Sequence, residues 1–94
     1  MTIGSMMLEL FIPASQSLKD KRRVVRSIKD RLHSRYNVAV AEVDHQETHQ
    51  RARLGIVGIT TERLQLEQLF DSIRVDVERN LPGDLVQAEI EILR

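Results

Sequence analysis

The alternation of two kinds of hydrophobic periodicity along the chain constrains the fold more than any other feature. Near the N-terminus, Met6, Leu8, Leu10 and Ile12 recur at every second position, which is the pattern of a half-buried strand. After Ser17 the apolar residues fall instead on one face of a helix. The two patterns together predict six elements, which are strands over 3–12, 38–44, 51–60 and 85–93 and helices over 18–36 and 62–80.

The predicted ends of the helices carry residues typical of helix boundaries. Ser17, followed by Asp20, resembles a capping arrangement at the start of the first helix. Thr61 is expected to cap the second helix, which Asn80 and the Pro82-Gly83 pair end. The order β-α-β-β-α-β then follows. Right-handed crossovers place both helices on one face of a four-stranded antiparallel sheet of order 4-1-3-2. We therefore predict an α+β, ferredoxin-like sandwich that forms one domain over residues 1–94.

The composition excludes several classes of protein. The 41% hydrophobic and 30% charged content is that of a folded globular chain, and 94 residues make one domain. No apolar run approaches the roughly 20 residues that cross a bilayer, so we expect no membrane association. The absence of cysteine removes disulfides and thiolate chemistry. We expect a cytoplasmic protein.

The charge is distributed very unevenly for a chain whose formal net charge is zero. The segment from Ser17 to Arg35 holds eight basic residues against two acidic ones, a local charge of +6. At 100° per residue, five of the basic residues form one stripe beside the apolar face. Such a helix is expected to face a polyanion such as RNA, with no DNA specificity. The candidate nucleic-acid contacts are Lys19, Arg22, Arg23, Arg26 and Lys29. Lys21 is expected at the apolar edge of this helix, with its stem along the surface.

The sheet face away from the helices is predicted to be moderately apolar. It offers few aromatic side chains, so we do not expect bases to stack on it as they do on RNA-recognition modules of this topology. An apolar face of this kind often marks a partner surface, and we expect a homodimer through it. The candidate interface residues are Met7, Phe11, Val57 and Ile59. Solvation of this face by water is the alternative.

No set of residues predicts a reaction. His45 and His49 stand in the polar segment that follows the second predicted strand, but no third ligand is fixed for a metal. Gly55 and Gly58, in the third predicted strand, are expected to admit a packed helix or to mark a bulge, not to hold phosphate. Ser15 and Ser17 have no evident base. We therefore expect a protein that is not an enzyme and that uses no metal or other cofactor.

Three segments resemble a known family. SLKDKRRVVRSIKDRL, YNVAVAEVDHQ and QRARLGIVGIT are similar to the YlxP-like family, small bacterial proteins of unknown function, and the likeness covers essentially the whole chain. The resemblance implies a ferredoxin-like fold. It also implies a place near transcription and translation factors, because members are often encoded close to ribosome-binding factor A. Two hypotheses follow. The first is an accessory protein that binds ribosomal RNA or the small ribosomal subunit. The second is a homo-oligomeric structural or regulatory module that acts through protein contacts or a small anionic ligand.

Overall fold

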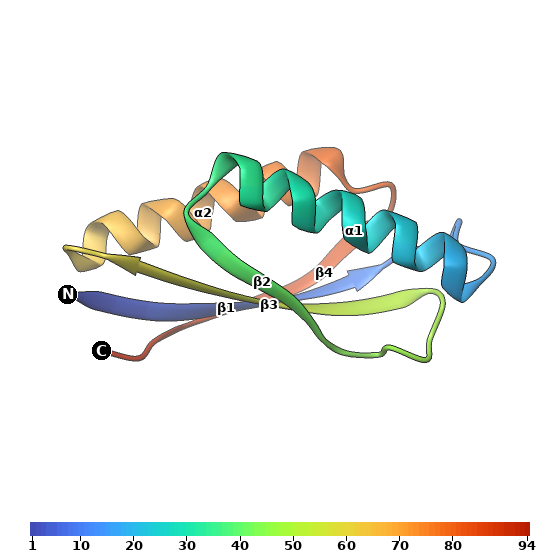
Figure 1. The fold of residues 1–94 in the computed structure, drawn as a ribbon, viewed down its shortest axis with the longest axis horizontal. Helices are drawn as coiled ribbons and strands as arrows, with labels where there is room; N and C mark the ends of the chain where they lie inside the picture. Colours follow the sequence, from blue (N-terminus) through green and yellow to red (C-terminus); the bar gives the residue numbers. More distant parts are fainter.

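Four strands and two helices follow one another in the order that the sequence predicts. The computed structural model describes residues 1–94, and its elements are β1 (Thr2–Phe11), α1 (Leu18–Arg35), β2 (Val38–Asp44), β3 (Arg51–Thr60), α2 (Arg63–Asn80) and β4 (Asp84–Ile92). The strands form one antiparallel sheet of order β2-β3-β1-β4. Both helices cover the same face of this sheet and leave the other face open (Figure 1). The predicted ferredoxin-like architecture and strand order are therefore confirmed. Neither helix is long and apolar enough to cross a membrane.

The core lies between the sheet and the helices and is built by alternate residues of the central strands. Met6, Leu8 and Leu10 of β1 are fully buried, as the period-two pattern predicts. Gly58 of β3 lies under α2, where an added Cβ would come within 3.2 Å of the Leu66 side chain. Gly55 does not serve the same purpose, because it faces the open side beneath the Met7 and Val43 side chains. The expectation of helix packing is thus correct for Gly58 and wrong for Gly55.

The two helices begin differently. At α1 the Ser17 hydroxyl accepts a hydrogen bond from the Asp20 amide at 3.1 Å, as predicted. At α2 the prediction of Thr61 as the cap is wrong, since Glu62 occupies that position. The Glu62 amide donates to the Gln65 side chain at 3.2 Å, which is half of a capping box. The polar pair three residues apart therefore sets the start of α2 one residue later than predicted.

Lys21 is a fully buried cation, and this corrects the prediction that it lies at the edge of the apolar face. Its Nζ forms an ion pair with Glu42 Oε2 at 2.9 Å and donates a hydrogen bond to the His45 carbonyl. Glu42 can reach it because Val38, Val40 and Glu42 alternate on the side of β2 that faces the helices. The ion pair lies outside hydrogen-bond geometry, so Glu42 Oε2 has no hydrogen-bond donor and depends on Lys21 for charge compensation.

Candidate nucleic-acid interface

The basic stripe is exposed on the outer side of α1. Of its five residues, Lys19, Arg22, Arg23 and Arg26 are exposed and Lys29 is half-buried. None of the five takes part in a salt bridge, because every ion pair in the structure uses other cations. The first four line one shallow surface hollow of about 260 Å³. The structure therefore brings the predicted candidates together as one surface with free positive charge.

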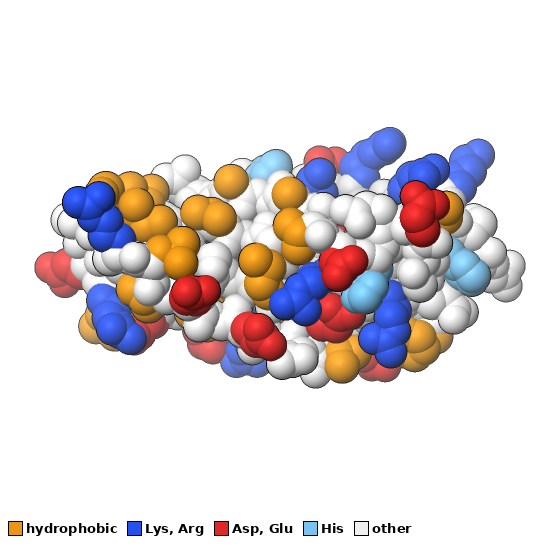
Figure 2. Space-filling model, turned by 90° about the horizontal axis from the view of Figure 1, so that it is seen from below, with side chains coloured by type: hydrophobic (Ala, Val, Ile, Leu, Met, Phe, Trp, Pro, Cys, Tyr) orange, Lys and Arg blue, Asp and Glu red, His pale blue; other side chains and the backbone are white.

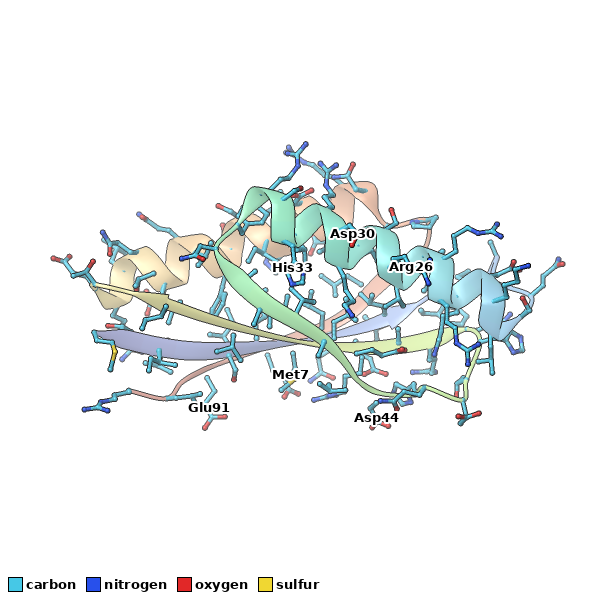
Figure 3. The ribbon with its side chains drawn as sticks, viewed as in Figure 1. Met7, Arg26, Asp30, His33, Asp44 and Glu91 are labelled. Carbon is cyan, nitrogen blue, oxygen red and sulfur yellow. The ribbon has the colours of Figure 1, made fainter.

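The packing of α1 fixes the direction of this stripe. Val25, Ile28 and Leu32 bury the inner face of α1 in the core. Arg31, on a flank of the helix, reaches Asp76 of α2. The stripe lies on the remaining arc, on the side of the free edge of β2. Arg23, at the border of this arc, also lines a hollow with Asn80 of α2. Figure 3 shows Arg26 on this side of α1, in front of the ribbon.

Two further polar residues share this arc of α1. His33 follows Lys29 by four residues and is exposed, so it extends the polar surface by a turn. Asp30 lies on the same side and is also exposed (Figure 3). The candidate contacts predicted from the sequence included only Lys and Arg, so His33 was not among them. The four-residue spacing between Lys29 and His33 could have placed His33 on the same face of the helix. Asp20 does not oppose the stripe freely, because its carboxylate accepts a hydrogen bond from the Gln16 amide at 3.1 Å.

The open face of the sheet is divided into an apolar part and a charged part. Hydrophobic side chains gather over the left and centre of this face, and side chains of both charges adjoin one another to the right (Figure 2). Val57 and Ile59 are 46% and 50% exposed and line a shallow apolar hollow of about 490 Å³. Met7 lies on the same face beside Gly55. Val57 is diagonal to Met7 across β1 and β3 and two residues from Ile59, so three of the four candidate interface residues form one row.

Phe11, the fourth candidate, is separated from the others. It follows Met7 by four residues along β1, a distance of about 13 Å. Its ring lies under the Arg51 guanidinium, 5.9 Å from the centroid, and contributes to the charged part of the face. The carboxylate of Glu9 stands between Met7 and Phe11 on the same face of β1. The apolar patch is thus smaller than the sequence predicts.

Glu9 is the centre of the charged part. Its carboxylate lies 2.7 Å from His45 Nε2, 3.3 Å from Arg53 Nη1 and 3.7 Å from Arg51 Nη1. His45 therefore turns toward the sheet, while His49 remains exposed in the segment before β3. No group of three or more His, Cys, Asp or Glu side chains comes together in a way that could hold a metal ion. The two Arg–Glu ion pairs and the His45–Glu9 contact form one polar network that joins β1, β3 and the end of β2.

Asp76 joins the two helices and was not predicted from the sequence. Its nearly buried carboxylate accepts hydrogen bonds from Arg31 Nε at 2.7 Å, the Tyr36 hydroxyl at 3.0 Å and Asn80 Nδ2 at 2.8 Å. Burial alone would raise the pKa of Asp76, but the hydrogen bonds from Arg31 and Tyr36 and the charges of Arg31 and Arg35 outweigh it and lower the pKa. Burial, followed by the bond to Asp76, raises the pKa of Tyr36. The contacts hold the end of α1 against α2.

The lowered pKa of Asp76 predicts a pH dependence of stability. A carboxylate with a depressed pKa in the folded state stabilises that state above its ordinary pKa of 3.8, and this stability is lost as the pH falls below it. Asp76→Asn should therefore be less stable than the wild type at pH 7, by about 1–2 kcal/mol, and lose less stability on acidification. Urea unfolding at pH 7 and in steps down to pH 2 measures both. If the free energy of unfolding of both proteins falls equally with decreasing pH, Asp76 does not have a lowered pKa in the folded state.

Comparison with known proteins agrees with the likeness seen in the sequence. Residues 3–90 match the family described as "Protein of unknown function (DUF503)". The chain is also 36% identical over 66 residues to the "Uncharacterized protein YlxP" of Bacillus subtilis (strain 168), an alignment that covers 70% of this chain and 72% of that protein. The resemblance to YlxP-like proteins is thereby confirmed.

Proposed function

We propose that this chain, which belongs to the DUF503 family, is an accessory protein that binds the phosphate backbone of RNA through the basic stripe of α1. The observation that carries the proposal is a set of five basic side chains, four of them exposed, that form no ion pair on one arc of a helix. Asp30 is the one exposed carboxylate on the same side. The rest of the chain balances their charge, so the positive potential is concentrated at this helix. Arg and Lys in this arrangement bind phosphates without reading bases.

The dimensions of the stripe fit a short stretch of backbone. Lys19 and Lys29 are ten residues apart on α1, a distance of about 15 Å along the helix axis. At about 3.4 Å per phosphate along one strand of a duplex, this distance corresponds to about four phosphates. Four of the side chains surround a common hollow, so a phosphate placed there meets several donors at once. Recognition of this kind depends on the shape of the RNA, as with proteins that bind double helices.

The few aromatic residues support recognition of backbone over recognition of bases. Phe70 is fully buried, Phe11 lies under Arg51, and the Tyr36 hydroxyl is bonded to Asp76. None of these rings adjoins the basic stripe as an open stacking platform. Proteins that hold single strands usually place bases on such rings. We therefore infer that the preferred RNA is base-paired.

The small ribosomal subunit is the proposed source of that RNA. The resemblance to the YlxP-like family supports it, because members are often encoded beside ribosome-binding factor A. The subunit also presents many base-paired RNA segments with accessible phosphates. Binding to it would need no catalytic residue and no cofactor.

A salt series on a ribosomal RNA hairpin tests this proposal. If α1 neutralises three to five phosphates, the association constant should fall by about 40- to 500-fold between 50 and 200 mM salt. Fluorescence anisotropy of a labelled hairpin measures this slope. A constant affinity across the series would show that phosphate contacts do not drive binding, and would overturn the proposal.

The exposed apolar patch favours a second candidate function, that of a homodimeric module. The strands are seven to ten residues long and about 4.8 Å apart, so they present a sheet face of about 590 Å². A standard interface buries roughly 800 Å² per partner. The apolar patch around Val57 and Ile59 covers only part of this face. A second copy could cover it with its own patch, and the dimer would then be weak, with a dissociation constant in the micromolar range.

The dimer is testable by one substitution on the patch. Ile59→Glu should leave the fold intact, because Ile59 is half exposed, and should make the protein monomeric at concentrations where the wild type dimerises. Light scattering during size-exclusion chromatography, over about 10–500 μM protein, measures the mass. Leu64→Glu, at an exposed residue of α2, is the matched control. A wild type that stays monomeric throughout would contradict the dimer.

A further inference from the structure

A second positively charged site lies between the C-terminal turns of α1 and α2. An open hollow of about 520 Å³ is present there, and its lining includes Arg31, Arg35, Tyr36, Ser72, Asp76 and Arg79. This volume is in the range of small-molecule sites, which run from about 300 to 1,000 Å³. The lining is strongly polar, so an apolar ligand is excluded and a charged one is favoured.

The two carboxylates that line this hollow, Asp71 and Asp76, each have a positively charged partner. Asp76 accepts hydrogen bonds from Arg31, Tyr36 and Asn80, which use both of its oxygens. Asp71 forms an ion pair with Arg74 at 2.9 Å, and Arg74 also pairs with Glu78 at 2.8 Å. Neither carboxylate is therefore left without a positively charged partner to repel an anion that enters the hollow.

The arginines, in contrast, retain free donors. Arg35 and Arg79 are exposed and form no ion pair. Arg31 uses only its Nε toward Asp76, and its side chain is 35% exposed, so both terminal nitrogens remain available. Asp76 also holds the Arg31 guanidinium in a fixed position. Three guanidinium groups from two helices thus border one hollow, and their forked donors match the oxygens of a phosphate.

Interaction of Arg35 and Arg79 with the ends of their own helices is an alternative role, but it explains less of this arrangement. Arg35 and Arg79 stand in the last turns of their helices, where a cation offsets the partial negative charge of the helix end. That effect accounts for each arginine separately. It does not require the two side chains to border the same hollow, or Arg31 to stand there with two unbonded nitrogens.

We propose that this hollow binds the phosphate group of a small phosphate-bearing molecule. Arg35 and Arg79 contact the phosphate from opposite helices, and the terminal nitrogens of Arg31 and the Ser72 hydroxyl complete the set of donors. Arg31 and Arg35 lie on the flank of α1 toward α2, away from the basic stripe. The site is therefore independent of the surface assigned to RNA.

Two probes, inorganic pyrophosphate and adenosine monophosphate, test the site by calorimetric titration at low salt. We expect saturable binding of at least one probe with a dissociation constant below about 10 mM. Tighter binding of the nucleotide supports the proposal with a nucleotide as the source of the phosphate, and tighter binding of pyrophosphate supports it with an inorganic source. Failure of both probes to saturate would overturn it.

Variants locate the binding. Arg35→Ala combined with Arg79→Ala should weaken it at least tenfold, because two charge-assisted contacts are lost. Arg22→Ala combined with Arg23→Ala removes the same charge from the stripe and should change it by less than twofold. Chemical shifts of the arginine Nε–H groups should move at Arg35 and Arg79 in the wild type. If both double variants weaken binding of the probe equally, the net charge of the protein explains the binding, and the proposal is overturned.

Discussion

Replacement of Arg22, Arg23 and Arg26 by glutamate is expected to weaken RNA binding by at least about 100-fold at 50 mM salt. The change removes three exposed cations that have no acidic partner and places three anions on the arc that would face phosphate. All three side chains are exposed on α1, so the fold should persist, and far-ultraviolet circular dichroism checks this. Anisotropy with the ribosomal RNA hairpin gives the affinity.

A control with the same change of net charge separates position from total charge. Arg63, Arg74 and Arg94 lie on α2 and at the C-terminus, outside the stripe. Their joint replacement by glutamate should lower the affinity by less than about fivefold, because long-range repulsion between exposed charges is screened by salt. If both triple variants lose affinity equally, net charge explains the binding and the stripe on α1 has no special role.

Lys21→Ala is expected to cause the largest loss of stability among changes of charged residues in α1, about 3–5 kcal/mol. The substitution leaves Glu42 in its partly buried position without its positive partner, and Glu42 Oε2 has no hydrogen-bond donor to replace it. It also removes the donor to the carbonyl of His45, a residue held at φ 65° in the left-handed region. Urea unfolding at pH 7 gives the free energy.

Two further variants make the result interpretable. Lys19→Ala, two residues away on the exposed side of α1, should change stability by less than about 0.5 kcal/mol. Lys21→Met combined with Glu42→Leu replaces the ion pair by apolar groups and should recover most of the loss. A cost below about 1 kcal/mol for Lys21→Ala would show that the ion pair does not anchor the end of β2 to α1.

The sequence predicted the fold well because each element carries a strong local pattern. The period-two burial of Met6, Leu8 and Leu10 and the helical period of Val25, Ile28 and Leu32 both reappear in the structure. The direction of the basic stripe followed from the same helical period, since a buried face fixes the opposite one. The prediction of a helix start was wrong where two neighbouring residues can both act as the N-cap. Thr61 was predicted as the cap of α2, but the Glu62–Gln65 pair determines where the helix starts.

Contacts between distant segments could not be read from local patterns. Lys21 and Glu42 are 21 positions apart, and Asp76 is 45 positions from Arg31. A charged residue near an apolar face is normally placed at its edge, and only the direction of Glu42 on β2 shows that Lys21 is inside. The separation of Phe11 from Met7 was accessible from their spacing along β1, but the contact of Phe11 with Arg51 depends on the register between β1 and β3.

Co-sedimentation with purified small ribosomal subunits across a salt series tests the central claim, that α1 binds RNA phosphates, most directly. The account predicts that the wild type pellets with the subunits at low salt, dissociates steeply as salt rises, and that the Arg22→Glu, Arg23→Glu, Arg26→Glu variant stays in the supernatant. Absence of the wild type from the pellet even at 50 mM salt, or equal pelleting of the variant, would contradict it.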